Sequence, residues 1–349
     1  MTENYILSRV ERSTGIFELN RPRALNSLNP EMIDIIDNHL KQWAADDTVT
    51  QVIVYSNSEK GFCAGGDVRF AREVVINGTP ELADKFFAIE YNMNGDLAHF
   101  PKPYIAIIDG VAMGGGLGIS AHGSHRVITE NAFAAMPEMA IGYIPDVGLP
   151  YMLQRMVGER GVASPALALF LVLTGWRLSP ADMMWSGLAT HFVPHAHIAK
   201  FHEQVITDGI DAAVERFASE IPEKSKLAEL FDDIEATFNF ASWAEIEAAL
   251  AEHPNRDFVA IVREHIENSS PSAIVAATEL MAAAAKCGDI RQELALETAL
   301  GEVIRREPDF AEGIRAVLVD KCRNPHFSPA TFAEVDPGKY RAILKPLTP

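Results

Sequence analysis

The stretches GFCAGGD at residues 61–67 and MGGGLG at residues 113–118 decide how this chain folds. Each ends a predicted strand and opens a predicted helix. Glycine lets the backbone approach a ligand closely, and a helix start leaves N–H groups without partners. Two such turns that face one another can direct two N–H groups at one carbonyl oxygen, as in an oxyanion hole made of backbone. A nearby carboxylate, such as Glu138 in the MPE of 136–138, would complete a site for activated acyl groups.

Strands and helices alternate through roughly the first 150 residues. A hairpin is expected over residues 4–19. Asn29 and Pro30 predict a helix start, because asparagine caps helices and proline suits the first helical position. The other expected elements are a helix over 80–99 and buried strands over 51–55, 104–109 and 126–129. This repetition of strand, turn and helix is typical of an α/β layer fold.

The chain changes character at about residue 150. Helical patterns dominate from there, with alanine-rich pieces such as 276–285, and no strand is expected. The sequence therefore predicts a helical C-terminal region that packs on the core and could cover the site. We place the boundary near residue 200, which gives a catalytic core over 1–200 and a helical region over 201–349.

Composition limits the partners of this chain. Its 349 residues carry a net charge of −18, which disfavours nucleic acid or an anionic membrane but permits a small anionic ligand. The three cysteines lie far apart with no CxxC pair, so neither a disulfide framework nor a zinc cluster is expected. The N-terminus lacks a secretory pattern, and the apolar run at 166–173 is too short to span a bilayer. We expect a cytoplasmic protein with no membrane partner.

Several motifs together carry a resemblance to a known family. The chain resembles the crotonase (enoyl-CoA hydratase/isomerase) superfamily, and within it the 3-hydroxyisobutyryl-CoA hydrolases. PDVG at 145–148 and DFAEGIRAVLVDK at 309–321 are distinctive of that branch. The wider superfamily motifs are LNRPRALNSL at 19–28, GFCAGGD at 61–67, KPYIAIIDGVAMGGGLG at 102–118 and AMPEMAIGYIPDVG at 135–148.

The resemblance implies a fold and an activity. The fold is α/β, a crotonase-like spiral core of repeated ββα units with a helical C-terminal region. The activity is hydrolysis of a coenzyme A thioester, 3-hydroxyisobutyryl-CoA or a close 3-hydroxyacyl-CoA, in valine breakdown. Coenzyme A is then part of the substrate, and no separate cofactor is expected. Crotonase relatives commonly assemble through their C-terminal helices, so a homo-oligomer is a possible state.

The resemblance also implies the residues of the site. Gly66 and Gly115 match the positions whose backbone N–H groups bind the thioester oxygen. Glu138 matches the catalytic glutamate of the superfamily, and Glu90 matches a substrate-contacting acid of the hydrolase branch. Contacts to the coenzyme A part of the substrate are expected from Arg21, Ala24, Ala64 and Asp67.

Gly118 and Asp146 separate a hydrolase from a hydratase in this comparison. Hydratases carry a second catalytic glutamate where this chain has Gly118, and usually a glycine where it has Asp146. Thioester hydrolysis needs attack at the carbonyl and a stabilised oxyanion, with no base placed for an alkene. Glu138 could act as general base on water or attack directly to give a mixed anhydride. Asp146 could bind the substrate hydroxyl, position Glu138 or assist the leaving thiolate.

Other interpretations fit the residues less well. A hydratase or isomerase using Glu138 alone conflicts with Gly118, and a non-catalytic acyl-CoA-binding protein would not need Glu138 together with both glycines. The sequence implies no histidine partner for Cys63, so this residue is expected to be a small buried hydrophobic side chain. Pro194 breaks the helix that the histidines of 191–197 would need to bind a metal, so no metal site is expected.

Overall fold

Pairs of strands recur along the chain in the computed structural model, which describes residues 4–58 and 60–345. Each pair has a longer strand, a shorter strand and then a helical segment. The longer strands lie in one sheet and the shorter ones in another, so every repeat steps from sheet to sheet. This confirms the crotonase-like spiral of ββα units. The pairs are β3 (Gln51–Ser56) with β4 (Gly61–Cys63), β5 (Tyr104–Ile108) with β6 (Val111–Met113), and β7 (His125–Ile128) with β8 (Phe133–Ala135).

The larger sheet has six strands in the order β1-β2-β3-β5-β7-β9, and the smaller has the order β4-β6-β8. β1 (Ile6–Glu11) and β2 (Thr14–Leu19) form the expected antiparallel hairpin, and the other neighbours pair in parallel. β9 (His191–Phe192) contradicts the expectation of no strand after residue 150. Two residues are too few to carry an alternating pattern, so this strand has no signature in the sequence.

The first helices form where their caps predict. The Asn29 side chain accepts a hydrogen bond from the backbone N–H of Met32 at 2.9 Å and caps α1 (Pro30–Ala45). Asp67 caps α2 (Val68–Ile76), which follows the first glycine turn. α3 (Pro80–Ala98) is the helix expected over 80–99, and it packs against α1 and α2. α4 (Gly115–Gly118) is a single turn that begins within the second glycine stretch.

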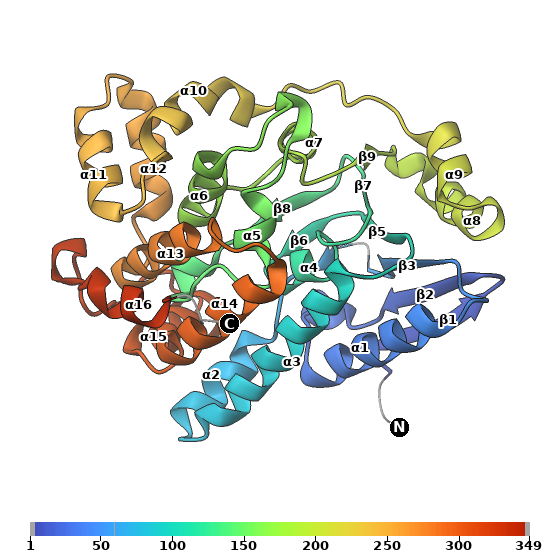
Figure 1. Cartoon of the computed structure of the whole chain (residues 1–349), viewed down its shortest axis with the longest axis horizontal. Coiled ribbons are helices and arrows are strands. Elements are labelled where there is room, and N and C mark those ends of the chain that lie inside the picture. The colour runs from blue at the N-terminus through green and yellow to red at the C-terminus, as the bar shows by residue number, and fades with distance from the viewer. Residues whose placement is uncertain (1–3, 59, 346–349) are drawn as a thin grey trace.

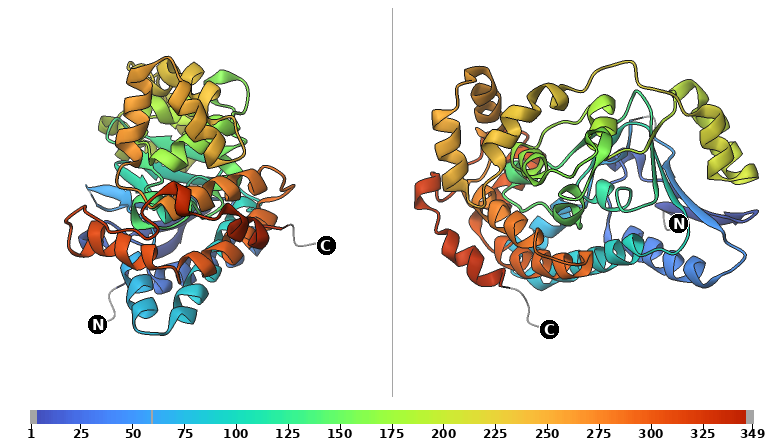
Figure 2. Two further views of the ribbon diagram at one scale, coloured as in Figure 1. Left: turned by 90° about the vertical axis from the view of Figure 1, so that its left-hand side faces the viewer. Right: turned by 45° about the horizontal axis from the view of Figure 1, so that its top comes forward.

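Two groups of helices lie on opposite sides of the molecule (Figure 1). α8 (Ile198–Asp208) and α9 (Ile210–Phe217) cover one face of the larger sheet and close a small apolar core with β2, β3, β5 and β7. The helices from α10 to α16 gather on the other side, as the right-hand view of Figure 2 shows. The expected division of the chain at residue 200 stays a prediction.

The helical part of the chain confirms the change of character at residue 150. Besides α8 and α9, its helices are α5 (Leu149–Leu153), α6 (Pro165–Thr174), α7 (Pro180–Ser186), α10 (Lys226–Phe238), α11 (Trp243–Glu252), α12 (Arg256–Ile266), α13 (Pro271–Ala284), α14 (Ile290–Ile304), α15 (Pro308–Ile314) and α16 (Pro337–Ile343). Among residues 4–58 and 60–345, no single helix is long and apolar enough to cross a membrane; only a pair bent by 119°, Leu149–Arg160 with Pro165–Thr174, meets that length and composition.

Candidate active site

A cavity of about 570 Å³ collects six of the predicted site residues in one place. It lies where both glycine turns, α3, the 3-10 helix η2 (Glu138–Ile141) and the segment after α15 meet. The predicted residues that line it are Ala64, Gly66, Glu90, Gly115, Glu138 and Asp146.

The two glycine turns lie directly against one another at the wall of this cavity. A Cβ atom on Gly115 would lie 3.0 Å from the backbone nitrogen of Gly66, so only glycine allows so close an approach. Gly65, with φ of 104°, lies against the carbonyl oxygen of Met113. In the part of the chain that the structure describes, neither the N–H of Gly66 nor that of Gly115 has a hydrogen-bond acceptor. Two free donors therefore lie side by side at the cavity wall, as an oxyanion hole requires.

Three carboxyl groups line the cavity: Glu90 from α3, Glu138 from η2 and Asp146 from the segment between η2 and α5. All three are buried, with exposed fractions of 1%, 6% and 5%. Burial, and secondarily the charge of Asp146, raises the pKa of Glu90 and of Glu138 well above its usual range. Burial also raises the pKa of Asp146 to about 7, although a hydrogen bond from Tyr91 acts in the opposite direction. The cavity therefore holds one acid, Asp146, whose protonation changes near neutral pH, beside two others whose pKa is raised.

The backbone around Asp146 is held in an unusual conformation. Val147 has φ of 58°, a left-handed value that β-branched residues rarely adopt. The ring nitrogen Nε2 of His122 lies 2.6 Å from the Val147 carbonyl oxygen, so this nitrogen carries the hydrogen. The next N–H, of Gly148, donates to Oε1 of Glu297 on α14 at 2.9 Å. These two bonds maintain a strained turn that directs Asp146 into the cavity.

The C-terminal helices also support Glu138. The backbone N–H of Ser270, at the start of α13, donates to the carbonyl oxygen of Met139 in η2 at 3.0 Å. α15 packs directly on η2, and Gly142 at the end of η2 has φ of 67° and no room for a side chain against Asp309. The carboxyl of Asp309 in turn accepts a hydrogen bond from Ser270 at 2.5 Å. The predicted packing of the helical region on the site is therefore seen at η2.

Three of the residues expected to contact coenzyme A, Arg21, Ala24 and Asp67, do not line the cavity. The Arg21 guanidinium is paired with the Asp67 carboxylate at 3.0 Å and donates to the carbonyl oxygen of Ser27 at 2.7 Å. Ala24 lies in a short 3-10 turn, Pro22–Ala24. The carbonyl oxygen of Leu25, which follows this turn, accepts a hydrogen bond from the N–H of Ala64, the residue after β4. Their contacts with coenzyme A stay a prediction.

Several cavity residues are not among the predicted site residues. Val317 and Leu318 lie within the motif at 309–321, which carries no predicted site role, whereas Arg323 and Pro325 follow that motif and Asn268 comes from the connection between α12 and α13. Arg323 is exposed, has φ of 53°, and is the only cation among the described residues that line the cavity. Because these segments are distant in sequence and irregular, no periodic pattern points to them.

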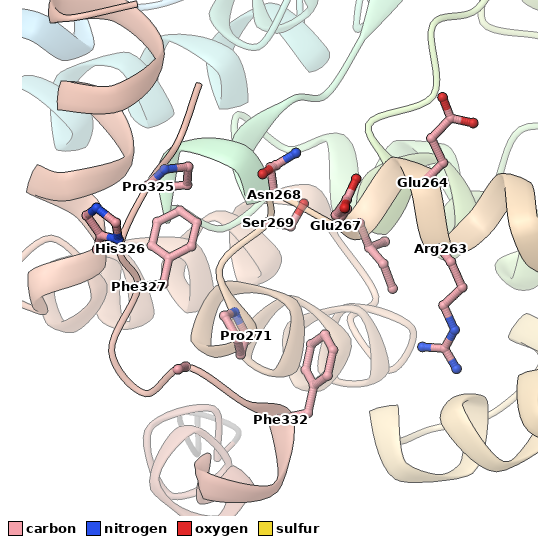
Figure 3. A pocket seen from close by; sticks show the side chains of 12 residues that line it. Arg263, Glu264, Glu267, Asn268, Ser269, Pro271, Pro325, His326, Phe327 and Phe332 are labelled. Carbon is pink, nitrogen blue, oxygen red and sulfur yellow. The ribbon is translucent and has the colours of Figure 1, made fainter. Parts of the chain in front are cut away.

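A second and larger cavity, of about 700 Å³, lies beside the first and shares Asn268 and Pro325 with it. Figure 3 shows its lining, which comes from the end of α12, the connection to α13 and the segment after Pro325. None of the predicted site residues lines it. The smaller cavity, with its paired glycines and buried acids, is therefore the candidate active site.

Comparisons with known proteins agree with this fold. A family model described as Enoyl-CoA hydratase/isomerase matches residues 14–344. The chain belongs to this family. Two solved structures share the fold over 99% of this chain and 98% of their own: a carnitinyl-CoA dehydratase from Mycobacterium thermoresistibile, with 38% identity and a TM-score of 0.90, and an enoyl-CoA hydratase from Rhodobacter sphaeroides, with 32% identity and a TM-score of 0.88.

Sequence relatives are more specific in their names. The chain is 36% identical over 341 residues to the Homo sapiens protein named 3-hydroxyisobutyryl-CoA hydrolase, mitochondrial, covering 95% of this chain and 86% of that protein. It is 33% identical over 344 residues to the Dictyostelium discoideum protein of the same name, covering 95% of this chain and 88% of that one. The predicted resemblance to this branch is thereby confirmed.

Proposed function

We propose that this chain is a thioester hydrolase that cleaves 3-hydroxyisobutyryl-CoA, or a closely similar 3-hydroxyacyl-CoA, to the free acid and coenzyme A. The observation that carries the proposal is the placing of two free backbone donors, Gly66 and Gly115, beside the buried carboxyl groups of Glu138 and Asp146. The names of the relatives support the choice of substrate and a place in valine breakdown. A cytoplasmic location and a homo-oligomer stay predictions.

The chemistry follows from these groups. The N–H groups of Gly66 and Gly115 hold the thioester oxygen and stabilise the negative charge that develops on it. Glu138 supplies the attack, either by taking a proton from water or by adding to the carbonyl carbon, and both routes need it ionised. In either route the thioester C–S bond breaks, coenzyme A leaves as the thiolate, and water supplies the new oxygen and the proton. An ionised Asp146 accepts a hydrogen bond from the substrate hydroxyl.

Hydration or dehydration of an alkene is the second candidate, because the two similar solved structures described above carry such names. Gly118 opposes it on two grounds. Glycine supplies no acid at this position, and a Cβ atom there would lie 2.8 Å from Cβ of Val147 and 2.9 Å from Nδ2 of Asn94. The space that a second catalytic glutamate would need is therefore filled by other side chains.

Arg323 is suited to the anionic end of the substrate. It lies exposed at the cavity wall and offers a guanidinium, a group that binds phosphate oxygens strongly. In a chain with a net charge of −18, such a local cation would offset repulsion of a phosphorylated ligand. We therefore assign Arg323 to the phosphates of coenzyme A.

Release of free thiol from a small panel of thioesters tests the proposal. Purified protein is incubated with 3-hydroxyisobutyryl-CoA, 3-hydroxypropionyl-CoA, isobutyryl-CoA and crotonyl-CoA in the presence of a thiol reagent, and crotonyl-CoA absorbance is followed in parallel. We expect free coenzyme A from the two 3-hydroxyacyl thioesters, slow release from isobutyryl-CoA, and no loss of the crotonyl chromophore. Hydration of crotonyl-CoA without thiol release from any ester would assign the chain to the second candidate instead.

A further inference from the structure

A buried chain of hydrogen bonds connects Asp146 to a cation outside the cavity. Tyr91 of α3 donates its hydroxyl hydrogen to Oδ2 of Asp146 at 2.8 Å. The hydroxyl oxygens of Tyr91 and Tyr143 are 3.1 Å apart. Nη1 of Arg305, at the end of α14, lies 2.6 Å from the Tyr143 oxygen. Four side chains from three places in the sequence, namely α3, the segment after η2 and the end of α14, thus form one continuous connection.

The direction of these hydrogen bonds is determined by chemistry. A guanidinium only donates, so the Tyr143 oxygen accepts from Arg305. Tyr143 then donates to Tyr91, and Tyr91 donates to Asp146, and each hydrogen has an acceptor. If Asp146 carried a proton and donated to Tyr91, one of the two tyrosine hydroxyl hydrogens would have no acceptor in this chain of bonds. The arrangement therefore favours Asp146 as a carboxylate.

The cation at the far end is deeply buried and firmly held. Arg305 is 1% exposed, its guanidinium lies 4.5 Å from the ring centre of Phe87, and it pairs with Asp84 at 2.7 Å. Arg306 binds the same Asp84, but its side chain is 43% exposed and, in the described structure, forms no hydrogen bond with Tyr143. Of these two arginines, Arg305 is thus the one connected to Asp146 by hydrogen bonds.

A glycine makes room for this connection. Gly301 lies in the interior of α14, where glycine costs about 1 kcal/mol relative to alanine. A Cβ atom there would lie 2.6 Å from the Tyr143 hydroxyl and 2.7 Å from Nη1 of Arg305. The weak helix former is explained by the contact that it permits.

Asp146 needs such support because acids surround it. Glu90 lies on α3, Glu138 on η2, and Glu293 and Glu297 on α14. Burial raises the pKa of each of these four carboxyl groups, and the charge of Asp146 raises it further. The groups that oppose this negative charge are the hydroxyls of Tyr91 and Tyr143 and the guanidinium of Arg305. Of the three cavity acids, within the described chain, only Asp146 accepts a hydrogen bond from another side chain.

We propose that Arg305, acting through Tyr143 and Tyr91, is a positioning residue that holds Asp146 as a fixed carboxylate in the active site. The inference rests on the proposed function, in which Glu138 and Asp146 act in their ionised forms. Without the hydrogen bonds that run from Arg305 through Tyr143 and Tyr91, the carboxyl groups of Glu138 and Asp146 together bind protons more strongly. The acid limb of the kcat/KM profile, which reports groups of the free enzyme, must then move to higher pH.

The test measures kcat/KM for 3-hydroxyisobutyryl-CoA from about pH 5 to about pH 9. We expect the acid limb of Tyr91→Phe to move up by about one pH unit and that of Tyr143→Phe by about half a unit. The double variant should match Tyr91→Phe, because the groups act in series. Near pH 9 all three should return to within about twofold of the unchanged protein. Gly301→Ala should shift the limb in the same direction without changing any group of the connection.

Arg306→Gln is the matched control, since it removes a positive charge that pairs with Asp84 and leaves the hydrogen bond between Arg305 and Tyr143 in place. Its acid limb should not move. Profiles of the tyrosine variants that fall by one factor at every pH, or an equal shift in Arg306→Gln, would overturn the inference. The carboxyl carbon resonance of Asp146 in ¹³C-labelled protein, assigned with Asp146→Asn, gives a readout without substrate. If the protein cleaves no thioester but this resonance titrates at higher pH in Tyr91→Phe, the proposed function fails and the inference stands; an unmoved titration refutes the inference alone.

Discussion

The carboxyl group of Glu90 lies directly against the second glycine turn: a Cβ atom on Gly115 would be 2.5 Å from its Oε1. The same oxygen has no hydrogen-bond partner in the described structure. Burial raises the pKa of Glu90, which favours its protonated form, and a protonated carboxyl group can donate a hydrogen bond. In that form, Glu90 and the N–H of Gly115 offer donors to the same small volume, which the thioester oxygen is proposed to enter.

Gly115→Ala should abolish most of the activity. The added methyl group displaces Glu90 and crowds the backbone nitrogen of Gly66, so the two donors lose their common target. We expect kcat for 3-hydroxyisobutyryl-CoA to fall by about 10²–10³-fold, the usual cost of one oxyanion-hole donor. Gly288→Ala is the control, because its nearest neighbour would be 3.9 Å away. Full activity in Gly115→Ala would exclude this turn from the site.

Glu138→Gln tests the residue that supplies the attack. The amide keeps the shape of the side chain but cannot take a proton or form an anhydride, so we expect kcat to fall by about 10³-fold or more while KM changes little. Single-turnover and steady-state thiol release measure both constants. Glu264→Gln, in the neighbouring larger cavity, should leave them unchanged. A large loss of kcat in Glu264→Gln with none in Glu138→Gln would place the chemistry in the larger cavity.

The sequence was sufficient for the fold and for the residues that lie within its motifs. Asn29, the glycine turns and the apolar strands act locally, so their elements form where a local pattern predicts them. The site needs more than this. Asn94 and Arg305 reach the cavity region only after helices distant in sequence have packed together, and nothing in their own neighbourhoods distinguishes them from ordinary helical residues. Arg21 and Asp67 lie in motifs that predict ligand contacts, and the fold also pairs them with each other, so their contacts with coenzyme A stay a prediction.

Gly118→Glu should not convert this protein into a hydratase. The site of the new side chain is occupied by Asn94 and Val147, and Val147 is already in a strained backbone conformation. Overpacking of this kind costs about 1–3 kcal/mol. We expect a lower Tm, reduced thiol release and no hydration of crotonyl-CoA. A stable variant that hydrates crotonyl-CoA would mean that the missing acid alone separates the two activities.

Arg323→Gln should weaken binding of the coenzyme A part of the substrate and leave the chemistry intact. We expect KM to rise by about three- to tenfold with kcat unchanged, as for the loss of one charge-assisted contact at an exposed site. The corresponding N-acetylcysteamine thioester lacks the phosphates, so its kcat/KM should be the same in both proteins. Lys321→Gln serves as the control. It removes an equal charge only two residues from Arg323, but Lys321 does not line the cavity. Equal losses with both thioesters would assign Arg323 to the acyl end of the cavity.

Glu293→Gln should stabilise the protein at alkaline pH. Neither carboxyl oxygen of Glu293 has a hydrogen-bond partner in the described structure, and burial raises the pKa of this group to about 8. An unfolded glutamate ionises near its ordinary value of 4.5, so between these values the folded state binds more protons and stability falls as pH rises. The glutamine cannot ionise and escapes this loss. We expect its Tm to exceed that of the unchanged protein by about 1–3 °C near pH 8, and the difference to vanish near pH 4. The exposed Glu302 of the same helix provides the control Glu302→Gln, which should show no such dependence on pH. A gain in Tm that is the same at both pH values would show that packing, and not the buried charge, limits stability at Glu293.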